Sequence, residues 1–156
     1  MTFSKVELYQ FVLWAGFAAI WAGVSLAGNL VAAPAKFQVE ALDTPLALQI
    51  GRAQFTWIGY VEWGLLIAMA AVFTVHLRYP PTLMSVGIAL FMFQQFWLQP
   101  MLRVRSDLII AGESVAPSQL HLIFAGVEFA KFLCLAVFAA LSLISVVKTV
   151  SEANPG

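Results

Sequence analysis

Long runs of apolar residues, separated by short polar segments, dominate the hydropathy pattern of this 156-residue chain. A helix needs about 20 apolar residues to cross roughly 30 Å of hydrocarbon, and four runs meet that requirement. They predict membrane spans at about residues 8–33, 55–77, 82–102 and 118–147. The sequence shows no internal repeat and no linker, so we expect residues 1–156 to form one domain. The predicted fold is an all-α, integral membrane four-helix bundle.

The first apolar run carries no charged residue between Leu8 and Lys36. A cleavable signal has a shorter apolar region of about 7–15 residues, so we expect this run to be a retained span, although the small residues 32–35 faintly resemble a cleavage site. Small residues recur in it at every fourth position and predict a seam for close helix packing. The residues of that seam are Ala15, Ala19, Gly23 and Ala27.

Proline, glycine and capping residues predict where the helices begin, bend and end. Asp43–Pro45 has a capping side chain followed by proline in the first turn, which predicts the start of the second helix. A helix from there to the end of the second span is longer than the bilayer is thick, so it either starts outside the hydrocarbon or breaks near Gly51. Pro34 is expected to end or kink the first helix and Pro100 to bend the third. Gly112 is a C-terminal stop.

The composition agrees with a membrane location and excludes several function classes. Hydrophobic residues make up 62% and charged residues only 10% of the chain, and its formal net charge is zero. Nucleic-acid binding is not expected, because it requires a basic surface. The single cysteine, Cys134, excludes an intrachain disulfide and a cysteine-rich metal site. We expect the lipid bilayer as a partner, with a second copy or another membrane protein as a further one, and neither a metal nor a cofactor.

Four spans place both termini on one side of the membrane. The basic residues divide almost evenly between the sides, so the positive-inside rule does not decide the orientation. Lys5, Arg78 and Lys148 lie on one side, and Lys36, Arg52, Arg103 and Arg105 on the other. The loops of the second side are longer and also carry acidic residues, so their arginines are candidates for a site. We therefore expect both termini in the cytoplasm, in the inner membrane of a bacterium.

Ionisable residues at membrane depth carry most of the functional information. Such a residue costs about 2.5–3.5 kcal/mol on insertion scales, so it usually faces the bundle interior and has a partner. Glu62 lies in the second span, and Glu128 and Lys131 lie in the fourth. Arg52 and His121 lie near the entrances of these spans. Both spans run inward from the long-loop side, so all five residues are expected in the same half of the membrane.

Helical spacing tests whether these residues can converge. His121 and Glu128 are seven residues apart and share one helix face, and Lys131 follows Glu128 at a spacing that permits an ion pair. The third span has a polar stripe with a four-residue spacing, formed by Gln95, Gln99, Arg103 and Asp107. The sequence therefore predicts a polar pocket that opens toward the long-loop side.

Two interpretations of these residues remain open. They tie the helices together, with Glu128 paired to Lys131 and Glu62 paired to Arg52 or Arg103, or they line a site for a small solute. Catalysis is the least favoured reading. The candidate ligand-binding residues are Arg52, Glu62, Gln99, Arg103, His121, Glu128 and Lys131.

Scattered positions along most of the chain resemble one family of small four-span membrane proteins. These positions are Gly28–Asn29, Pro34–Phe37, Ala47–Arg52, Phe55, Leu98–Pro100 and His121. That family shares a domain of unknown function with the human transmembrane protein linked to cisplatin resistance, and it is distantly similar to copper-resistance D-type domains. The resemblance implies a four-helix membrane protein without assigned chemistry. We expect a non-enzymatic protein that binds or passes a small solute, or a subunit of a membrane assembly.

A second resemblance supplies the alternative, which is a membrane enzyme. Arg52–Gln54 followed by Glu62 looks like the arginine-to-glutamate motif of the trimeric four-span proteins of eicosanoid and glutathione metabolism. The spacing is longer here, and Thr56 or Trp57 stands where that family has an asparagine. The arginine and tyrosine that the family has in its third span are also absent. This resemblance implies glutathione as the substrate.

Overall fold

The computed structural model describes residues 5–73 and 81–153, and apart from short connections this part of the chain is helical, without a strand. Four long helical rods account for it, two of which contain short π-helical segments, named η1 and η3. In chain order the elements are α1 (Lys5–Val24), η1 (Ser25–Ala32), α2 (Ala33–Ala35), the 3₁₀ turn η2 (Lys36–Gln38), α3 (Thr44–Phe73), α4 (Thr82–Phe93), η3 (Gln94–Leu98), α5 (Gln99–Ile110) and α6 (Leu120–Ala153).

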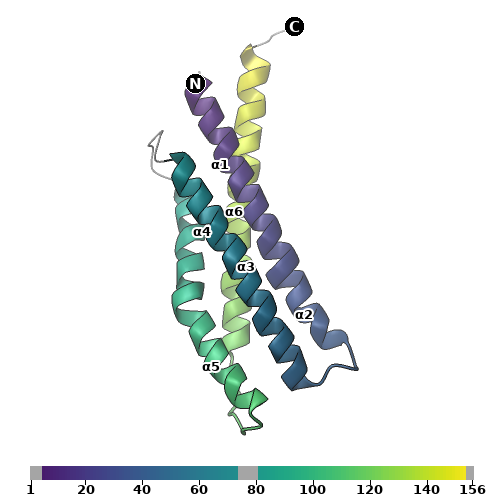
Figure 1. Cartoon of the computed structure of the whole chain (residues 1–156). Coiled ribbons are helices and arrows are strands. Elements are labelled where there is room, and N and C mark those ends of the chain that lie inside the picture. Colours follow the sequence, from purple (N-terminus) through teal and green to yellow (C-terminus); the bar gives the residue numbers. More distant parts are fainter. Residues whose placement is uncertain (1–4, 74–80, 154–156) are drawn as a thin grey trace.

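The rods pack side by side as an elongated bundle (Figure 1). The last rod, α6, packs along α1 and α4, while α3 packs along α5 and α1. The start of α1 and the end of α6 lie at one end of the bundle, and α2, the start of α3 and the end of α5 lie at the other (Figure 1). The predicted all-helical bundle of four rods is therefore confirmed, with α6 as its central element.

The predicted start of the second helix and stop of the third are both confirmed. The Oδ1 atom of Asp43 accepts a hydrogen bond of 2.8 Å from the backbone N–H of Leu46, which caps α3. Gly112 has a φ of 81°, a left-handed conformation that favours glycine. The N–H of Glu113 donates to the carbonyl of Leu108 across it at 3.0 Å, as in a Schellman motif. The alternative of a helix break near Gly51 is wrong, because α3 continues through it.

Pro34 and Pro100 each follow a π-helical segment by two residues. Proline has no N–H to donate, and its ring clashes with the carbonyl four residues earlier. A wider turn of the preceding helix relieves that clash, and η1 and η3 occupy these positions. Neither proline ends its helix, since α2 and η2 extend the first rod to Gln38 and α5 extends the third to Ile110. The third helix is thus longer than the predicted span 82–102.

Small and aromatic residues of the first rod face the bundle interior. Ala18 and Trp21 are completely buried, and Trp21 packs edge-on against Phe91 with ring centroids 5.3 Å apart. The predicted seam at every fourth residue is wrong beyond its first member, because Ala19 and Gly23 are exposed. An α-helix has 3.6 residues per turn, so a four-residue step drifts by about 40° each time. The residues of the observed seam are Ala15, Ala18, Ala22 and Ser25.

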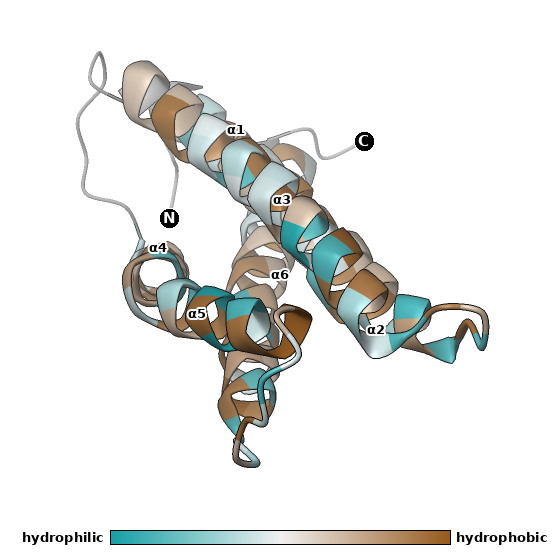
Figure 2. Ribbon diagram, turned by 60° about the horizontal axis from the view of Figure 1, so that its bottom comes forward, coloured by the Kyte–Doolittle hydropathy of each residue, from teal (hydrophilic) through white to brown (hydrophobic). Residues whose placement is uncertain are grey.

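Most buried side chains are apolar, but several polar and ionisable side chains are buried as well, and many large apolar side chains are exposed. Glu62, Glu128 and Lys131 are buried, while Trp57 and Trp97 are 70% and 66% exposed. Two stretches of the described chain, residues 8–38 and 120–152, are long and apolar enough to cross a membrane. Hydrophilic residues instead gather at one end, on α5, near α2 and along the first turns of α3 (Figure 2).

Candidate functional site

A cavity of about 520 Å³ opens at the hydrophilic end of the bundle. The end of η1, α2, η2, the first turns of α3, the length of α5 and the first turn of α6 surround it, so every rod contributes. Its apolar wall includes Leu30, Ala33, Leu48, Phe55, Leu102, Ile109 and Phe124. We call this cavity the pocket. A pocket of this size accommodates a small organic molecule.

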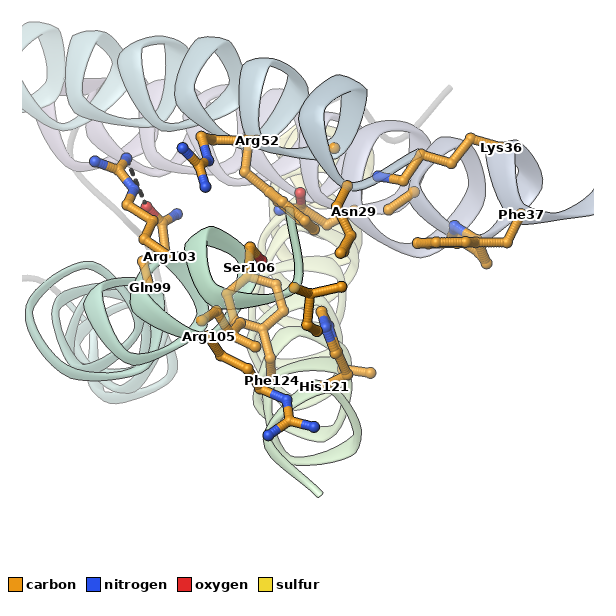
Figure 3. Close-up of a pocket in the computed structure, with 18 of the residues that line it drawn as sticks. Asn29, Lys36, Phe37, Arg52, Gln99, Arg103, Arg105, Ser106, His121 and Phe124 are labelled. Atoms are coloured by element: carbon orange, nitrogen blue, oxygen red, sulfur yellow. Dashed lines mark hydrogen bonds between the residues drawn. The ribbon is translucent and has the colours of Figure 1, made fainter. Parts of the chain in front are cut away.

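Basic side chains from four different elements surround the pocket, as Figure 3 shows. They are Lys36 on η2, Arg52 on α3, Arg103 and Arg105 on α5, and His121 on α6. None of the residues that line the pocket is an aspartate or a glutamate. The carboxylate of Asp107, which lies outside the lining, forms an ion pair with the exposed side of Arg52. The pocket therefore carries a net positive charge.

Lys36 is held at the pocket by two aromatic rings. Its Nζ atom lies 5.3 Å from the ring centroid of Phe37 and 5.2 Å from that of Phe55, which are cation–π distances. The same atom lies directly against Gly51, where a side chain would displace it. A glycine at this position of α3 thus gives the ammonium group room beside the cavity.

Two polar atoms at the pocket are buried without a hydrogen-bond partner. They are the Oδ1 atom of Asn29 and the Nε atom of Arg52. Arg103 is only weakly held, by a 3.4 Å hydrogen bond from its Nη2 to Gln99 Oε1 (Figure 3). Buried polar groups in folded proteins are normally paired, so unpaired ones need an explanation. A polar ligand in the pocket would supply these missing partners.

A second group of polar residues lies deeper in the bundle, and we call it the buried cluster. Lys131 on α6 donates from Nζ to Oε1 of Glu62 on α3 at 2.5 Å. Its Nζ also lies 3.1 Å from Oε1 of Glu128, one turn away on the same helix. The Nζ atom stands 5.6 Å from the ring centroid of Phe91. All three charged side chains are at most 2% exposed.

Neutral donors from the other two rods complete the buried cluster. Trp21 on α1 donates its indole N–H to Oε1 of Glu62 at 2.9 Å. Gln94 donates from Nε2 to Oε2 of Glu128 at 2.7 Å, and the hydroxyl of Ser25 donates to Oε1 of the same residue. Ser25 and Gln94 are the first residues of η1 and η3, so both π-helical segments begin at the buried cluster.

The structure divides the predicted site residues between these two places. Arg52, Gln99, Arg103 and His121 line the pocket, while Glu62, Glu128 and Lys131 form the buried cluster. The expected pair between Glu128 and Lys131 is present. The expected pair between Glu62 and Arg52 or Arg103 is wrong, because Lys131 and Trp21 hold Glu62 and Asp107 holds Arg52.

The residues predicted to bind a ligand did not include two basic residues of the pocket, Lys36 and Arg105, although the arginines of the long loops were considered for a site. Both lie just outside the predicted spans, where a positive charge was counted toward membrane orientation. Their position in the longer loops, near the other basic residues of that side, was the feature of the sequence that could have indicated a role in ligand binding. In the residues that the structure describes, no three His, Cys, Asp or Glu side chains gather as a metal site.

Comparisons with protein-family models, with curated proteins and with solved structures find no match to this chain.

Proposed function

We propose that the chain is an integral membrane protein whose four rods all cross the bilayer. Large apolar side chains project outward from α3 and η3 as well as from α1 and α6, among them Trp57, Ile67 and Phe96. A water-soluble bundle would bury such residues and expose its ionisable side chains. Here the ionisable side chains of the buried cluster lie inside the bundle, which is the arrangement that the hydrocarbon interior of a bilayer favours. The lipid bilayer is accordingly the first partner of this protein.

The function of this membrane protein is to bind a small amphipathic anion in the pocket. The observation that carries this proposal is the ring of basic side chains, from Lys36, Arg52, Arg103, Arg105 and His121, around an otherwise apolar cavity. Carboxylate or phosphate oxygens would accept hydrogen bonds from the arginines, which are suited to planar, bidentate recognition. The apolar wall would take the hydrocarbon part of the ligand.

The resemblance to the small four-span family is part of this proposal. Ten of the positions that carry it line the pocket, although they are scattered along the chain: Asn29, Pro34, Lys36, Phe37, Leu48, Gly51, Arg52, Phe55, Gln99 and His121. A shared binding pocket would account for the resemblance at these ten positions. The glutathione alternative has less support, because Arg52 lines the pocket whereas Glu62 belongs to the buried cluster.

A titration with ligands that differ only in head-group charge tests the binding function. The full chain, in phosphatidylcholine nanodiscs, is titrated with dodecanoate, dodecanol and dodecylammonium. We expect dodecanoate to bind tightest, since a hydrogen bond to a charged group contributes about 1.5–3 kcal/mol, or roughly tenfold to a hundredfold in Kd. Arg103→Gln and Arg105→Gln should each weaken dodecanoate binding by about that factor.

Lys148→Gln is the matched control, because Lys148 is an exposed cation on α6 far from the pocket. It should leave the Kd for dodecanoate unchanged. Acetate and glutathione distinguish the source of the anion. If acetate binds as well as dodecanoate, the apolar wall has no role and the proposal fails. If glutathione binds tightest and Arg52→Ala abolishes its binding, the enzyme alternative replaces it.

A further inference from the structure

The buried cluster contains more negative than positive charge. Glu62 and Glu128 supply two carboxyl groups, and Lys131 supplies a single ammonium group within 2.5 and 3.1 Å of them. All the other groups that the described elements place against these three side chains are neutral: Trp21 from α1, Ser25 from η1, Phe91 from α4 and Gln94 from η3. With every ionisable group charged, the cluster would carry a net charge of minus one.

Apart from Lys131, the basic residues nearest to the two carboxyl groups along α3 and α6 are Arg52 and His121, and both lie too far away to compensate that charge. His121 precedes Glu128 by seven residues on α6, which is about 10 Å along a helix. Arg52 precedes Glu62 by ten residues on α3, which is about 15 Å along a helix, and it is already paired with Asp107. Cys134, a half-buried thiol one helical turn beyond Lys131, contributes no positive charge. The excess charge must therefore be removed within the cluster itself.

Binding of one proton is the simplest way to remove the excess negative charge. An unpaired charge in a low-dielectric interior is strongly unfavourable, and a carboxyl group in that position takes up a proton. Both carboxyl groups contact the same ammonium group, so the proton is assigned to the pair and not to one glutamate alone. We propose that the buried cluster of Glu62, Glu128 and Lys131 is a binding site for one proton, which makes the cluster neutral.

Gln94 can pair with Glu128 through its side-chain amide, whether or not Glu128 is protonated. Its side chain is 1% exposed, and its Oε1 atom is buried without a donor although the same amide contacts Glu128. A half-turn of the amide would let that oxygen accept the O–H of a protonated Glu128 across the same 2.7 Å gap. The beginning of η1 and η3 at this cluster is a further indication, because π-helical turns occur often at functional sites.

The proton site lies directly behind the pocket. Ser25 donates to Glu128, and Asn29, four residues later in η1, lines the pocket. The proton site does not depend on the anion proposed for the pocket, because none of the three ionisable residues of the buried cluster lines the cavity. A failure of anion binding would therefore leave the proton site intact.

Infrared spectroscopy counts the protons directly, because a protonated carboxyl group has a C=O stretching band that a carboxylate lacks. The full chain is reconstituted in phosphatidylcholine vesicles at neutral pH and measured in H₂O and in D₂O. We expect a C=O stretching band with the intensity of one protonated carboxyl group per chain, and this band should shift in D₂O. Glu62→Gln and Glu128→Gln should each abolish the band, because the remaining carboxylate and Lys131 are neutral as an ion pair. Lys131→Met should double it, because two carboxyls then need two protons.

Glu113→Gln is the control, since Glu113 is an exposed carboxylate in the connection between α5 and α6 and should leave the band unchanged. If Lys131→Met does not fold, the double variant Glu128→Gln/Lys131→Met replaces it, with one carboxyl, no cation and an expected count of one. A wild-type protein without the band overturns the proposal, whether a metal cation or an ionised cluster is the reason. A band that survives both glutamine variants also overturns it.

Discussion

Lys131 on α6 and Glu62 on α3 form a buried ion pair between residues 69 positions apart, with Nζ 2.5 Å from Oε1. The pair joins the central helix to the rod that carries Arg52 at its pocket end. Lys131 is completely buried, so its ammonium group has no access to water and depends on the two glutamates for its partners. The contacts of Lys131 with the two glutamates are therefore the main polar interactions that fix how the helices pack.

Removal of this cation should be strongly destabilising. We expect Lys131→Met to lower the free energy of unfolding in detergent by about 3–5 kcal/mol, because two buried carboxyl groups lose their counter-ion. Addition of Glu62→Gln to this variant should recover part of the loss. Lys148→Met makes the same chemical change at an exposed position of α6 and should cost less than about 0.5 kcal/mol. Simple additivity of the Lys131 and Glu62 substitutions would show that the two residues do not interact.

The loss of stability caused by Lys131→Met should increase as the pH rises. If the buried cluster must be neutral, as proposed above, the folded variant holds a proton on each of its two buried carboxyl groups, whereas in the unfolded chain both are ionised at neutral pH. The folded state then binds more protons than the unfolded state, so its stability falls as the pH rises. Thermal unfolding at mildly acidic and at mildly alkaline pH measures this difference, and a loss that does not depend on pH would contradict it.

Trp21 stabilises the buried cluster through one hydrogen bond to Glu62. Trp21→Phe keeps an aromatic ring against Phe91 but removes the N–H donor, and we expect it to cost about 1.5–3 kcal/mol, the value for a hydrogen bond to a charged group. Trp57→Phe, at a 70% exposed position of α3, should cost less than about 0.5 kcal/mol. Equal midpoints of thermal unfolding for the two variants would mean that the indole N–H has no structural role.

Asp107 would compete with the proposed anion for Arg52, because the two side chains form an ion pair at the edge of the pocket. Asp107→Asn should therefore tighten dodecanoate binding. An exposed ion pair contributes about 0–1 kcal/mol, so the expected gain is at most about fivefold in Kd. Glu113→Gln removes the same charge from an exposed position in the α5–α6 connection and should have a smaller effect. Weaker binding in Asp107→Asn would show that the aspartate helps to form the site.

Four spans place the two ends of the chain on the same side of the membrane. A tag at either terminus should be accessible from one side, which we expect to be the cytoplasm. A tag within residues 112–117, between α5 and α6, should be accessible from the other side. Protease protection in sealed vesicles distinguishes these arrangements. Termini on opposite sides would rule out the four-span topology.

Features that depend on one helix could be predicted from the sequence. The cap at Asp43, the stop at Gly112 and the pairing of Glu128 with Lys131 are set by spacing along a single segment, and all three are present. The inward orientation of Glu62 also followed, because the cost of an unpaired charge in hydrocarbon requires it.

Features that depend on how helices rotate against one another could not be predicted. The polar stripe of the third span was expected to include Gln95, yet Gln94 is the residue that contacts Glu128. A π-helical turn shifts the following residues around the helix axis, and the sequence signals it only indirectly, through Pro100. The partition of the polar residues into a pocket and a cluster likewise depends on packing between rods that are distant in sequence.

We propose that the buried cluster and the core around it lie within a shell of apolar side chains that face lipid. Trp57 and Trp97 belong to that shell, whereas Trp14 and Trp21 are buried. The most direct test is fluorescence quenching by phosphatidylcholine brominated on its acyl chains, compared between wild type and Trp57→Phe/Trp97→Phe. We expect strong quenching of the wild type and loss of most of the quenchable fluorescence in the double variant. Quenching of Trp57 and Trp97 by aqueous iodide, with none by the brominated lipid, would contradict it.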